Sequence, residues 1–299
     1  MIADINDDWK RNLYEELIIS QTGTQQEKDK AYYEIGQYYL NCAPISLYKY
    51  FRDKDLYLNN VRNNKLWYSS PCNFNDVYDC DIFFDDKKIF ESLWYMASEG
   101  KLIRLGSAMG KMISTEINKS IMSGKTHLTE IKNTTGVTCF SEVKDSLLMW
   151  AHYADNHRGF CVEYNLLDIN KKLKFTPIPV IYTDEIACFD SINIETLDED
   201  SKKLITTSVS LKSPEWSYER EWRIIRDKGA CGDKWDDNKK GALLDMIKPS
   251  SIILGCNAKP DFEQKVKEYC QNSRINLYKM EKDERQYKLN QKTIFEFDN

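Results

Sequence analysis

Strand-like and helical segments follow one another irregularly along this chain, and this order constrains the fold more than any other feature. Short runs rich in aromatic or aliphatic residues and bounded by polar residues predict β-strands. Such runs are found at residues 47–51, 65–69, 136–140, 160–164, 218–226, 251–254, 275–280 and 287–289. A doubly wound sheet would require a regular β–α–β rhythm, which these spacings lack. We therefore predict an α+β fold built on a mixed sheet.

Helical spacing of apolar residues is concentrated in two parts of the chain. Residues 1–44 are expected to form a helical hairpin, because apolar residues recur every three or four positions on both sides of Gln21–Thr24 and Pro44 stops the second helix. The rest of the chain, residues 45–299, is expected to form one α+β domain. Helical spacing returns within it at about residues 85–130, which predicts a helical insertion.

Charge and cysteine content exclude several classes of protein. The sequence has 42 Lys and Arg against 47 Asp and Glu, a net charge of −5, which argues against a broad basic surface for nucleic acid. Nine cysteines without a CxxC pair, and only three histidines, favour reduced thiols over disulfides or a metal centre. The N-terminus is unlike a signal peptide, and no apolar run reaches 18 residues. We expect a cytoplasmic protein that binds no membrane and needs no metal.

The most informative stretch for chemistry is residues 215–223, EWSYEREWR. If residues 218–226 form a strand, Glu219, Glu221 and Arg223 project from one face because strand side chains alternate. The two carboxylates would lie about 7 Å apart, where one can hold a substrate hydroxyl while the other removes a proton or stabilises positive charge. We take both as candidate catalytic residues. The alternative is a solvated strand edge on which arginines neutralise the carboxylates.

A second group of candidates lies on a helix predicted at residues 145–155, with Asp145 as its N-cap. His152 can act there as a catalytic acid, a base or a hydrogen-bonding anchor. Trp150 and Tyr153 offer aromatic faces for a bound ring. The alternative is a core helix whose histidine is satisfied by a backbone carbonyl.

A third group combines basic and aromatic residues near two early strands. Such residues can neutralise a phosphate and stack on a base. The cofactor-binding candidates in this group are Lys49, Tyr50, Arg52, Ser69, Phe74 and Asn75. Asp76 and Asp79, taken with Glu142, leave open a metal-dependent nuclease. The sequence contains neither GxxxxGK(S/T) nor GxGxxG, which disfavours ATPases and Rossmann dehydrogenases.

Several motifs, taken in order, resemble those of a known bacterial family. They are LYKYF, LWYSSPCNFND, GVTCFSE, LLMWAHYADNHRGFCVEY, KSPEWSYEREWR and SIILGCNAKPDFEQKV. Together they span roughly residues 45–290 and resemble the bacterial domain of unknown function 2971. The resemblance predicts membership of that family, whose name leaves the function open.

The order of polar residues on the predicted strands also resembles mono-ADP-ribosyltransferases and related NAD-using toxins. This resemblance implies a split, mixed sheet that clamps NAD, with a late Glu-x-Glu motif matched by Glu219 and Glu221. The second glutamate would bind the nicotinamide-side ribose and stabilise positive charge in the transition state. Lys49 would take the early-strand position where those enzymes carry His or Arg, and either Ser69 with Ser70 or Tyr68 would take the middle-strand position. Lys49, Arg52 or Arg223 would offset the charge of the pyrophosphate.

These observations lead to one functional hypothesis and two alternatives. The hypothesis is an NAD-dependent ADP-ribosyltransferase that modifies a macromolecule, RNA or protein, as a bacterial toxin or phage-defence effector. An antitoxin partner would bind through the N-terminal helices. The alternatives are a non-enzymatic module for ligand sensing or interaction, and the metal-dependent nuclease.

Overall fold

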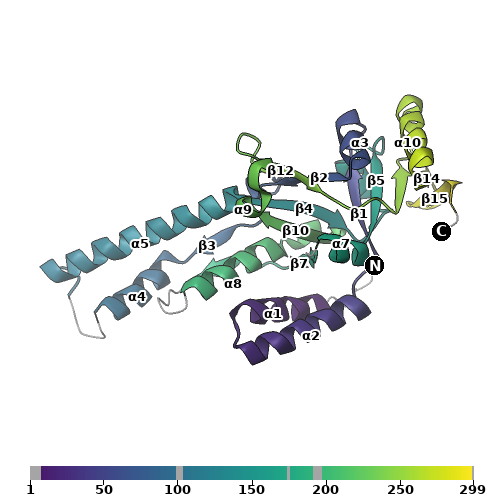
Figure 1. The fold of residues 1–299 in the computed structure, drawn as a ribbon. Helices are drawn as coiled ribbons and strands as arrows, with labels where there is room; N and C mark the ends of the chain where they lie inside the picture. Colours follow the sequence, from purple (N-terminus) through teal and green to yellow (C-terminus); the bar gives the residue numbers. More distant parts are fainter. Residues whose placement is uncertain (1–7, 99–103, 174–175, 191–196, 298–299) are drawn as a thin grey trace. The chain divides into compact units, whose positions relative to one another are not determined.

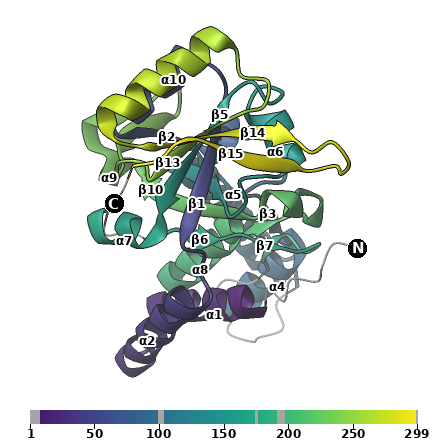
Figure 2. The same cartoon turned by 90° about the vertical axis from the view of Figure 1, so that its right-hand side faces the viewer.

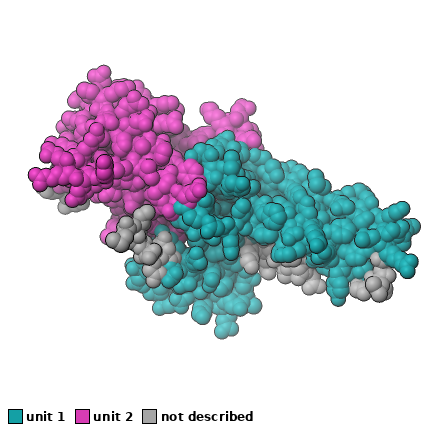
Figure 3. Space-filling model, turned by 180° about the vertical axis from the view of Figure 1, so that it is seen from behind, with its two compact units in different colours: residues 1–43, 70–134, 181–214 teal, residues 44–69, 135–180, 215–299 magenta. Residues whose placement is uncertain are grey.

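The computed structural model describes residues 8–98, 104–173, 176–190 and 197–297, and its contacts group the chain into two compact units (Figure 3). The helical unit comprises residues 1–43, 70–134 and 181–214, and the sheet unit comprises residues 44–69, 135–180 and 215–299. The first division falls at the predicted end of the N-terminal hairpin. The later divisions of the chain differ from the single domain predicted for residues 45–299. Two segments of that range, residues 70–134 and 181–214, group with the N-terminal helices.

The helical unit begins with α1 (Asp8–Thr22) and α2 (Gln25–Asn41), which pack against each other as the predicted hairpin. The backbone N–H and the hydroxyl of Thr24 both donate hydrogen bonds to Glu27, which fixes the start of α2. The first helix also packs against α8 (Leu197–Ser210). These three helices therefore form one packed group within the unit.

The predicted helical insertion contains α4 (Asp86–Ala97) and α5 (Ala108–Asn133), which lie side by side (Figure 1). Residues 99–103 of the insertion lie outside the described residues. The shared core of the two helices contains buried isoleucines, which are Ile89, Ile117 and Ile121.

Short strands and one 3-10 helix complete the helical unit. The parallel pairs are β3 (Ile82–Phe84) with β8 (Ala187–Phe189), and β7 (Ile181–Tyr182) with β9 (Leu211–Lys212). The 3-10 helix η1 (Pro71–Asn73) precedes them in the chain.

Over the described residues, the sheet unit contains an 11-stranded sheet in the order β11-β12-β2-β4-β1-β5-β13-β14-β15, with β10 paired to β4 and β6. The strands are β1 (Ser46–Phe51), β2 (Lys65–Ser69), β4 (Thr135–Ser141), β5 (Phe160–Asn165), β6 (Ile178–Pro179), β10 (Glu221–Asp227), β11 (Trp235–Asp236), β12 (Gly241–Asp245), β13 (Ser251–Leu254), β14 (Asn276–Lys282) and β15 (Leu289–Phe295). The β13–β14 pair is parallel, whereas β5 pairs antiparallel with both of its neighbours, β1 and β13. The α+β class and the mixed sheet are as predicted.

Helices cover both faces of this sheet. On one face, Trp150 of α6 (Leu147–Tyr153) packs on Tyr50, with ring centroids 5.2 Å apart. On the other face, Phe262 of α10 (Pro260–Ser273) lies 5.6 Å from Phe160, and Figure 2 shows α10 lying along that side of the strands. The remaining short helices of the unit are α3 (Asp55–Arg62), α7 (Leu166–Leu173), α9 (Lys228–Cys231) and η3 (Gly232–Lys234).

The sheet is split beside β4. One edge of β4 pairs with β10 along the whole length of that strand. Its other edge shares one residue pair with β1, Tyr48 with Ser141, and one with β2, Ser69 with Val137. By contrast, β1 pairs with β5 from end to end. The β4–β10 ladder is therefore joined to its other neighbours through few backbone contacts.

The strand predicted at residues 218–226 is wrong at its start. The residues before Glu221 form the 3-10 helix η2 (Pro214–Glu219), and β10 begins only at Glu221. Arg220 between them has a φ of +44°, a left-handed conformation that breaks strand alternation. Glu219 is therefore not a strand residue.

The N-cap of α6 also differs from the prediction. The Ser146 hydroxyl accepts the backbone N–H of Met149 at 3.3 Å, so Ser146 rather than Asp145 caps the helix. The helix ends at Tyr153, and residues 155–157 that follow it all have left-handed backbone conformations. The helix is thus shorter at both ends than the predicted range of 145–155.

Candidate functional site

Glu221, the first residue of β10, forms a buried ion pair with Arg223 on the same face of the strand. Its two carboxylate oxygens accept hydrogen bonds from Nε and Nη2 of the guanidinium at 2.8 and 3.0 Å. Arg223 has 0% exposed surface, and Glu221 has 3%. This bidentate geometry satisfies both charges and fixes the carboxylate in one orientation. Glu221 is therefore a rigidly held carboxylate.

Glu219, at the end of η2, is held by other partners. Tyr153 of α6 donates its phenolic hydrogen to the Glu219 carboxylate. Ser141 Oγ donates to the Glu219 carbonyl at 2.6 Å, and the backbone N–H of Glu142 donates to the carbonyl of Arg220 at 3.0 Å. These long-range bonds hold residues 219 and 220 in a turn. The predicted arrangement of both carboxylates on one strand face is therefore wrong.

Lys49 lies on the other side of the sheet from Glu221. Tyr48 of β1 pairs with Ser141, and Ser141 pairs in turn with Glu221. Because strand side chains alternate, Tyr48 rather than Lys49 shares the Glu221 face. Lys49 Nζ donates to the carbonyl of Cys139 at 2.7 Å, and burial lowers the pKa of Lys49. The lysine is thus engaged within the sheet, and the nearby Glu221 charge partly offsets the effect of burial on its pKa.

Trp150 and Tyr50 are core residues that hold α6 on the sheet. Trp150 is fully buried, and its indole Nε1 donates to the carbonyl of Lys144 at 2.8 Å. The Tyr50 hydroxyl donates to the carbonyl of Val143 at 2.7 Å, and its ring meets Trp150 edge to face. The two rings therefore support α6 rather than offering a face to a ligand.

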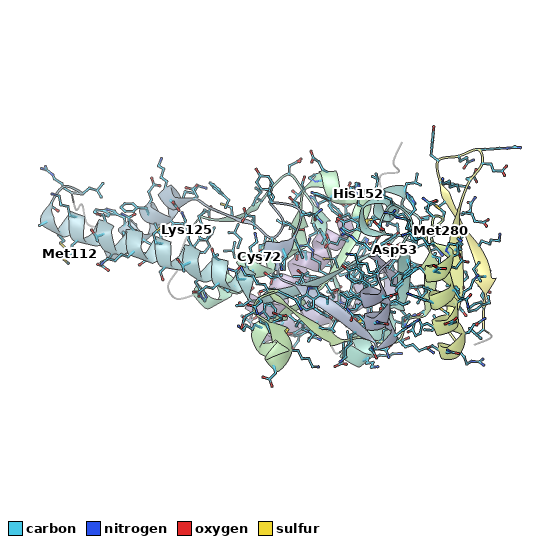
Figure 4. The ribbon with its side chains drawn as sticks, turned by 90° about the horizontal axis from the view of Figure 1, so that it is seen from above. Asp53, Cys72, Met112, Lys125, His152 and Met280 are labelled. Carbon is cyan, nitrogen blue, oxygen red and sulfur yellow. The ribbon has the colours of Figure 1, made fainter. Side chains whose placement is uncertain are left out.

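His152 is exposed on α6 (Figure 4), and it lies next to aromatic residues of η2. Its ring centroid is 6.2 Å from that of Tyr218, and the Tyr218 ring is 6.1 Å from that of Trp216. We call these three residues the aromatic run. Glu219 directly follows Tyr218 in the chain, so the run borders the held carboxylate. Side chains of this kind can stack on an unpaired ring.

Of the remaining cofactor-binding candidates, Ser69 and Arg52 belong to the sheet unit. Ser69 pairs with Val137, four residues along β4 from Ser141, which is about 13 Å at the usual strand rise. Arg52 directly follows β1 and is exposed. The last two candidates belong to the helical unit, and they are Phe74 and Asn75.

A row of polar residues, which we did not predict, crosses the face of the sheet that carries Glu221. It runs through directly paired residues of five strands, which are Glu221, Ser141, Tyr48, Glu163 and Ser251. Tyr48 Oη and Ser251 Oγ donate to the two carboxylate oxygens of Glu163, at 3.3 and 2.6 Å. Alternation within β1 and β5 predicts which residues of the same strand share a face with Tyr48 or Glu163. Only the strand pairing shows that these two residues lie side by side in the polar row.

Cys139 shares this face of the sheet, and its thiol interacts with Glu221. Burial raises its pKa well above the ordinary value, and the Glu221 charge raises it further. A thiol of this kind is a poor nucleophile, because the thiolate is the reactive form. The chemistry of the site therefore depends on its carboxylates.

The carboxylates considered for a metal-dependent nuclease have other partners. The two oxygens of Glu142 accept hydrogen bonds from Arg220 Nε and Trp222 Nε1, both at 2.8 Å. Asp79, in the helical unit, pairs with Lys212. In the part of the chain that the structure describes, no group of three or more His, Cys, Asp or Glu side chains is arranged to hold a metal ion.

Among the residues that the structure describes, no helix has both the length and the apolar character needed to span a membrane.

A family model described as Protein of unknown function (DUF2971) matches residues 149–224. The match begins within α6 and ends within β10, so it includes Tyr153, Glu163, Glu219 and both members of the buried ion pair. It supports the predicted resemblance to that family over this part of the chain. No curated protein and no solved structure matches the sequence. The resemblance to ADP-ribosyltransferases stays a prediction.

Proposed function

We propose that the sheet unit is an NAD-dependent ADP-ribosyltransferase with a split sheet, and that Glu221 is its charge-stabilising carboxylate. The observation that carries this proposal is the Glu-x-Glu segment at the start of β10. Glu221 is the first residue of β10, and Arg223 holds its carboxylate in one orientation. Glu219 is the last residue of η2, which precedes β10. The single residue pair between β1 and β4, beside Glu221, agrees with the split sheet of that enzyme class.

The reaction requires a fixed negative charge. The bond between ribose C1′ and the nicotinamide nitrogen breaks, and its electron pair leaves with nicotinamide. Positive charge develops at C1′, and a preorganised carboxylate opposes this charge without having to reorient. Glu221 meets the requirement, since Arg223 holds it in one position. An acceptor oxygen or nitrogen forms the new bond to C1′ and loses its proton, for which Glu219 is the neighbouring base.

The aromatic run beside Glu219 favours an acceptor with an exposed ring. Unpaired RNA bases stack on such side chains. The net charge of −5 favours local recognition over a broad basic surface. We therefore take RNA as the first acceptor to test, with protein as the alternative, and either modification would suit a toxin or phage-defence effector. An antitoxin partner would bind the α1–α2 hairpin, where Tyr32 and Tyr33 are exposed.

Release of nicotinamide from NAD by the purified protein, with and without cellular RNA or lysate protein, tests this proposal. We expect release by the wild type and a loss of roughly 10²–10³-fold in the double variant Glu221→Gln/Arg223→Gln, the range for removing one preorganised electrostatic group. The double variant removes both buried charges, so neither is left unpaired. Glu142→Gln is the matched control, because it removes a carboxylate beside the same end of β4 whose partners are Arg220 and Trp222.

Two results contradict the proposal. One is a wild-type protein that releases no nicotinamide under any of these conditions. The other is a folded double variant with full activity. An equal loss in Glu142→Gln would attribute the effect to stability rather than to chemistry, and this would also remove Glu221 from its role.

A ligand-sensing or interaction module is the second candidate, and a groove along α4 and α5 favours it. The groove has a volume of about 980 Å³ and is lined largely by apolar residues, among them Phe90, Trp94 and Met122. Large apolar hollows of this kind are typical of binding sites. Strong binding of an apolar fluorescent dye that Met122→Glu weakens, in a protein that releases no nicotinamide, would favour this candidate.

A further inference from the structure

Glu163 places a carboxylate on the face of the sheet that carries Glu221, next to core residues of β5 and β13. Cys161, two residues earlier on β5, and its pair partner Ile253 are fully buried there. Glu163 itself is half-buried, and it accepts hydrogen bonds from two uncharged hydroxyls, those of Tyr48 and Ser251. A partly desolvated carboxylate is costly for folding unless its charge has a use. This position is therefore suited to a ligand.

The chemistry of Glu163 selects the kind of ligand. An ionised carboxylate accepts hydrogen bonds through about four lone-pair sites, and the two hydroxyls take two of them. A ligand that donates hydrogen bonds can use the others, whereas a phosphate in that place is repelled. Vicinal ribose hydroxyls are such donors, and an acidic side chain bound to them is a known means of distinguishing NAD from its 2′-phosphorylated form, NADP.

The position of Glu163 matches one end of a dinucleotide. It shares a face with Glu221 and lies three strand spacings away along the polar row, which is about 14 Å. Glu221 has 3% exposed surface and Ser141 has 0%, so a nucleotide whose reacting ribose lies at Glu221 requires the sheet to open beside β4, and it would then extend along the row toward Glu163. We infer that Glu163, positioned by Tyr48 and Ser251, binds the hydroxyls of the adenosine ribose and selects NAD over NADP. This inference rests on the proposed function.

The test is the ratio of kcat/KM for NAD to that for NADP, measured by nicotinamide release. We expect the wild type to prefer NAD by roughly 100-fold or more, because like charges that face each other cost several kilocalories per mole. In Glu163→Gln, kcat/KM for NAD should fall roughly 10-fold through KM, since a charged hydrogen bond becomes a neutral one. Its kcat/KM for NADP should rise. Glu142→Gln, the matched control outside the polar row, should keep the wild-type ratio.

Calorimetric binding of ADP-ribose, with and without the 2′-phosphate, repeats the comparison without turnover. Glu163→Asp keeps the charge, so it should retain the preference for NAD while KM for NAD rises. If Glu163→Gln does not fold, Tyr48→Phe serves instead. It removes one positioning hydroxyl and should raise KM for NAD several-fold with kcat unchanged.

Several outcomes overturn the inference. They are an unchanged ratio in Glu163→Gln, a wild type that uses both dinucleotides equally, and, where Tyr48→Phe is the variant used, an unchanged KM. A wild-type protein that neither binds nor cleaves either dinucleotide overturns the proposed function as well. That result is distinct from a protein that cleaves NAD but does not discriminate through Glu163.

Discussion

In the sheet unit, charged side chains are buried, whereas in the α4–α5 pair of the helical unit apolar side chains are exposed. Arg223 has 0% exposed surface, but Met112 on α5 (Figure 4) exposes 69%. Both arrangements cost stability, because a buried charge loses its hydration and an exposed apolar side chain gains nothing from burial. Departures of this kind are expected at functional sites. The comparison indicates that the sheet unit holds charge in place and that the α4–α5 pair presents an apolar surface.

The largest effect is expected from the single substitution Glu221→Gln. It removes the negative charge but leaves the fully buried Arg223 guanidinium without its counter-ion. Breaking one half of a buried pair costs about 3–5 kcal/mol. We expect the free energy of unfolding, measured by urea titration, to fall by that amount. The double variant Glu221→Gln/Arg223→Gln should recover most of the loss.

Asp79→Asn in the helical unit is the matched control for this prediction. The Asp79–Lys212 pair is also buried, but its nitrogen–oxygen distance is 3.4 Å against 2.8 Å for Arg223 and Glu221. The looser pair should therefore lose less, about 2 kcal/mol. A greater loss at Asp79 than at Glu221 would reverse the comparison between the two units.

A smaller effect is expected from Lys49→Met, which removes a half-buried charge from β1. Because burial lowers the pKa of Lys49, the unfolded chain binds more protons than the folded one between that lowered pKa and about 10.4. Wild-type stability should therefore gain from this group as the pH rises through that window, and the variant should lack this gain. At pH 7 we expect the variant to be more stable by about 1 kcal/mol.

Urea titrations of both proteins from pH 7 to pH 10.5 measure this difference, since other titrating groups cancel in the comparison. Nicotinamide release should be unchanged in Lys49→Met. A large loss of activity in a stable variant would return Lys49 to the site, in the early-strand role that the resemblance to ADP-ribosyltransferases gave it.

The smallest effect is expected from Met112→Gln on α5. An exposed helix residue outside any buried network changes stability by no more than about 0.5 kcal/mol. Binding of an apolar dye to the α4–α5 pair should nevertheless decrease, because the substitution removes exposed apolar surface. A stability loss above 1 kcal/mol in a thermal melt would mean that Met112 is part of the core and that the contrast between the units is overstated.

Much of the fold could be predicted because local sequence determines it. Segments 47–51 and 160–164 carry the aromatic residues and alternation typical of strands, and both are strands in the structure. The failure at Glu219 has a non-local cause. The turn at Arg220 depends on hydrogen bonds from a distant strand, and no local pattern indicates a left-handed arginine.

The candidate site shows the same limit. The Glu-x-Glu motif and its arginine were visible in the sequence, and so was Tyr153. The polar row was not, because a strand pattern tells which residues share a face but not which strands pair or in what register. Tyr48, Ser141 and Glu163 come from segments far apart in the chain, and only the ladder aligns them. The same limit explains why Lys49 was chosen as the early-strand candidate, although the strand pairing brings its neighbour Tyr48 into the polar row.

The single residue pairs on one edge of β4 have a consequence for motion. Few backbone hydrogen bonds must open there for the β4–β10 ladder to move as a body, so this opening requires only part of the free energy of global unfolding. Amide hydrogens along that edge should exchange with solvent faster than those between β1 and β5, which pair from end to end. Glu221 would then stay fixed within the β4–β10 ladder. Its accessibility to a ligand would depend on local opening of the strand pairing beside β4 rather than on a separate lid.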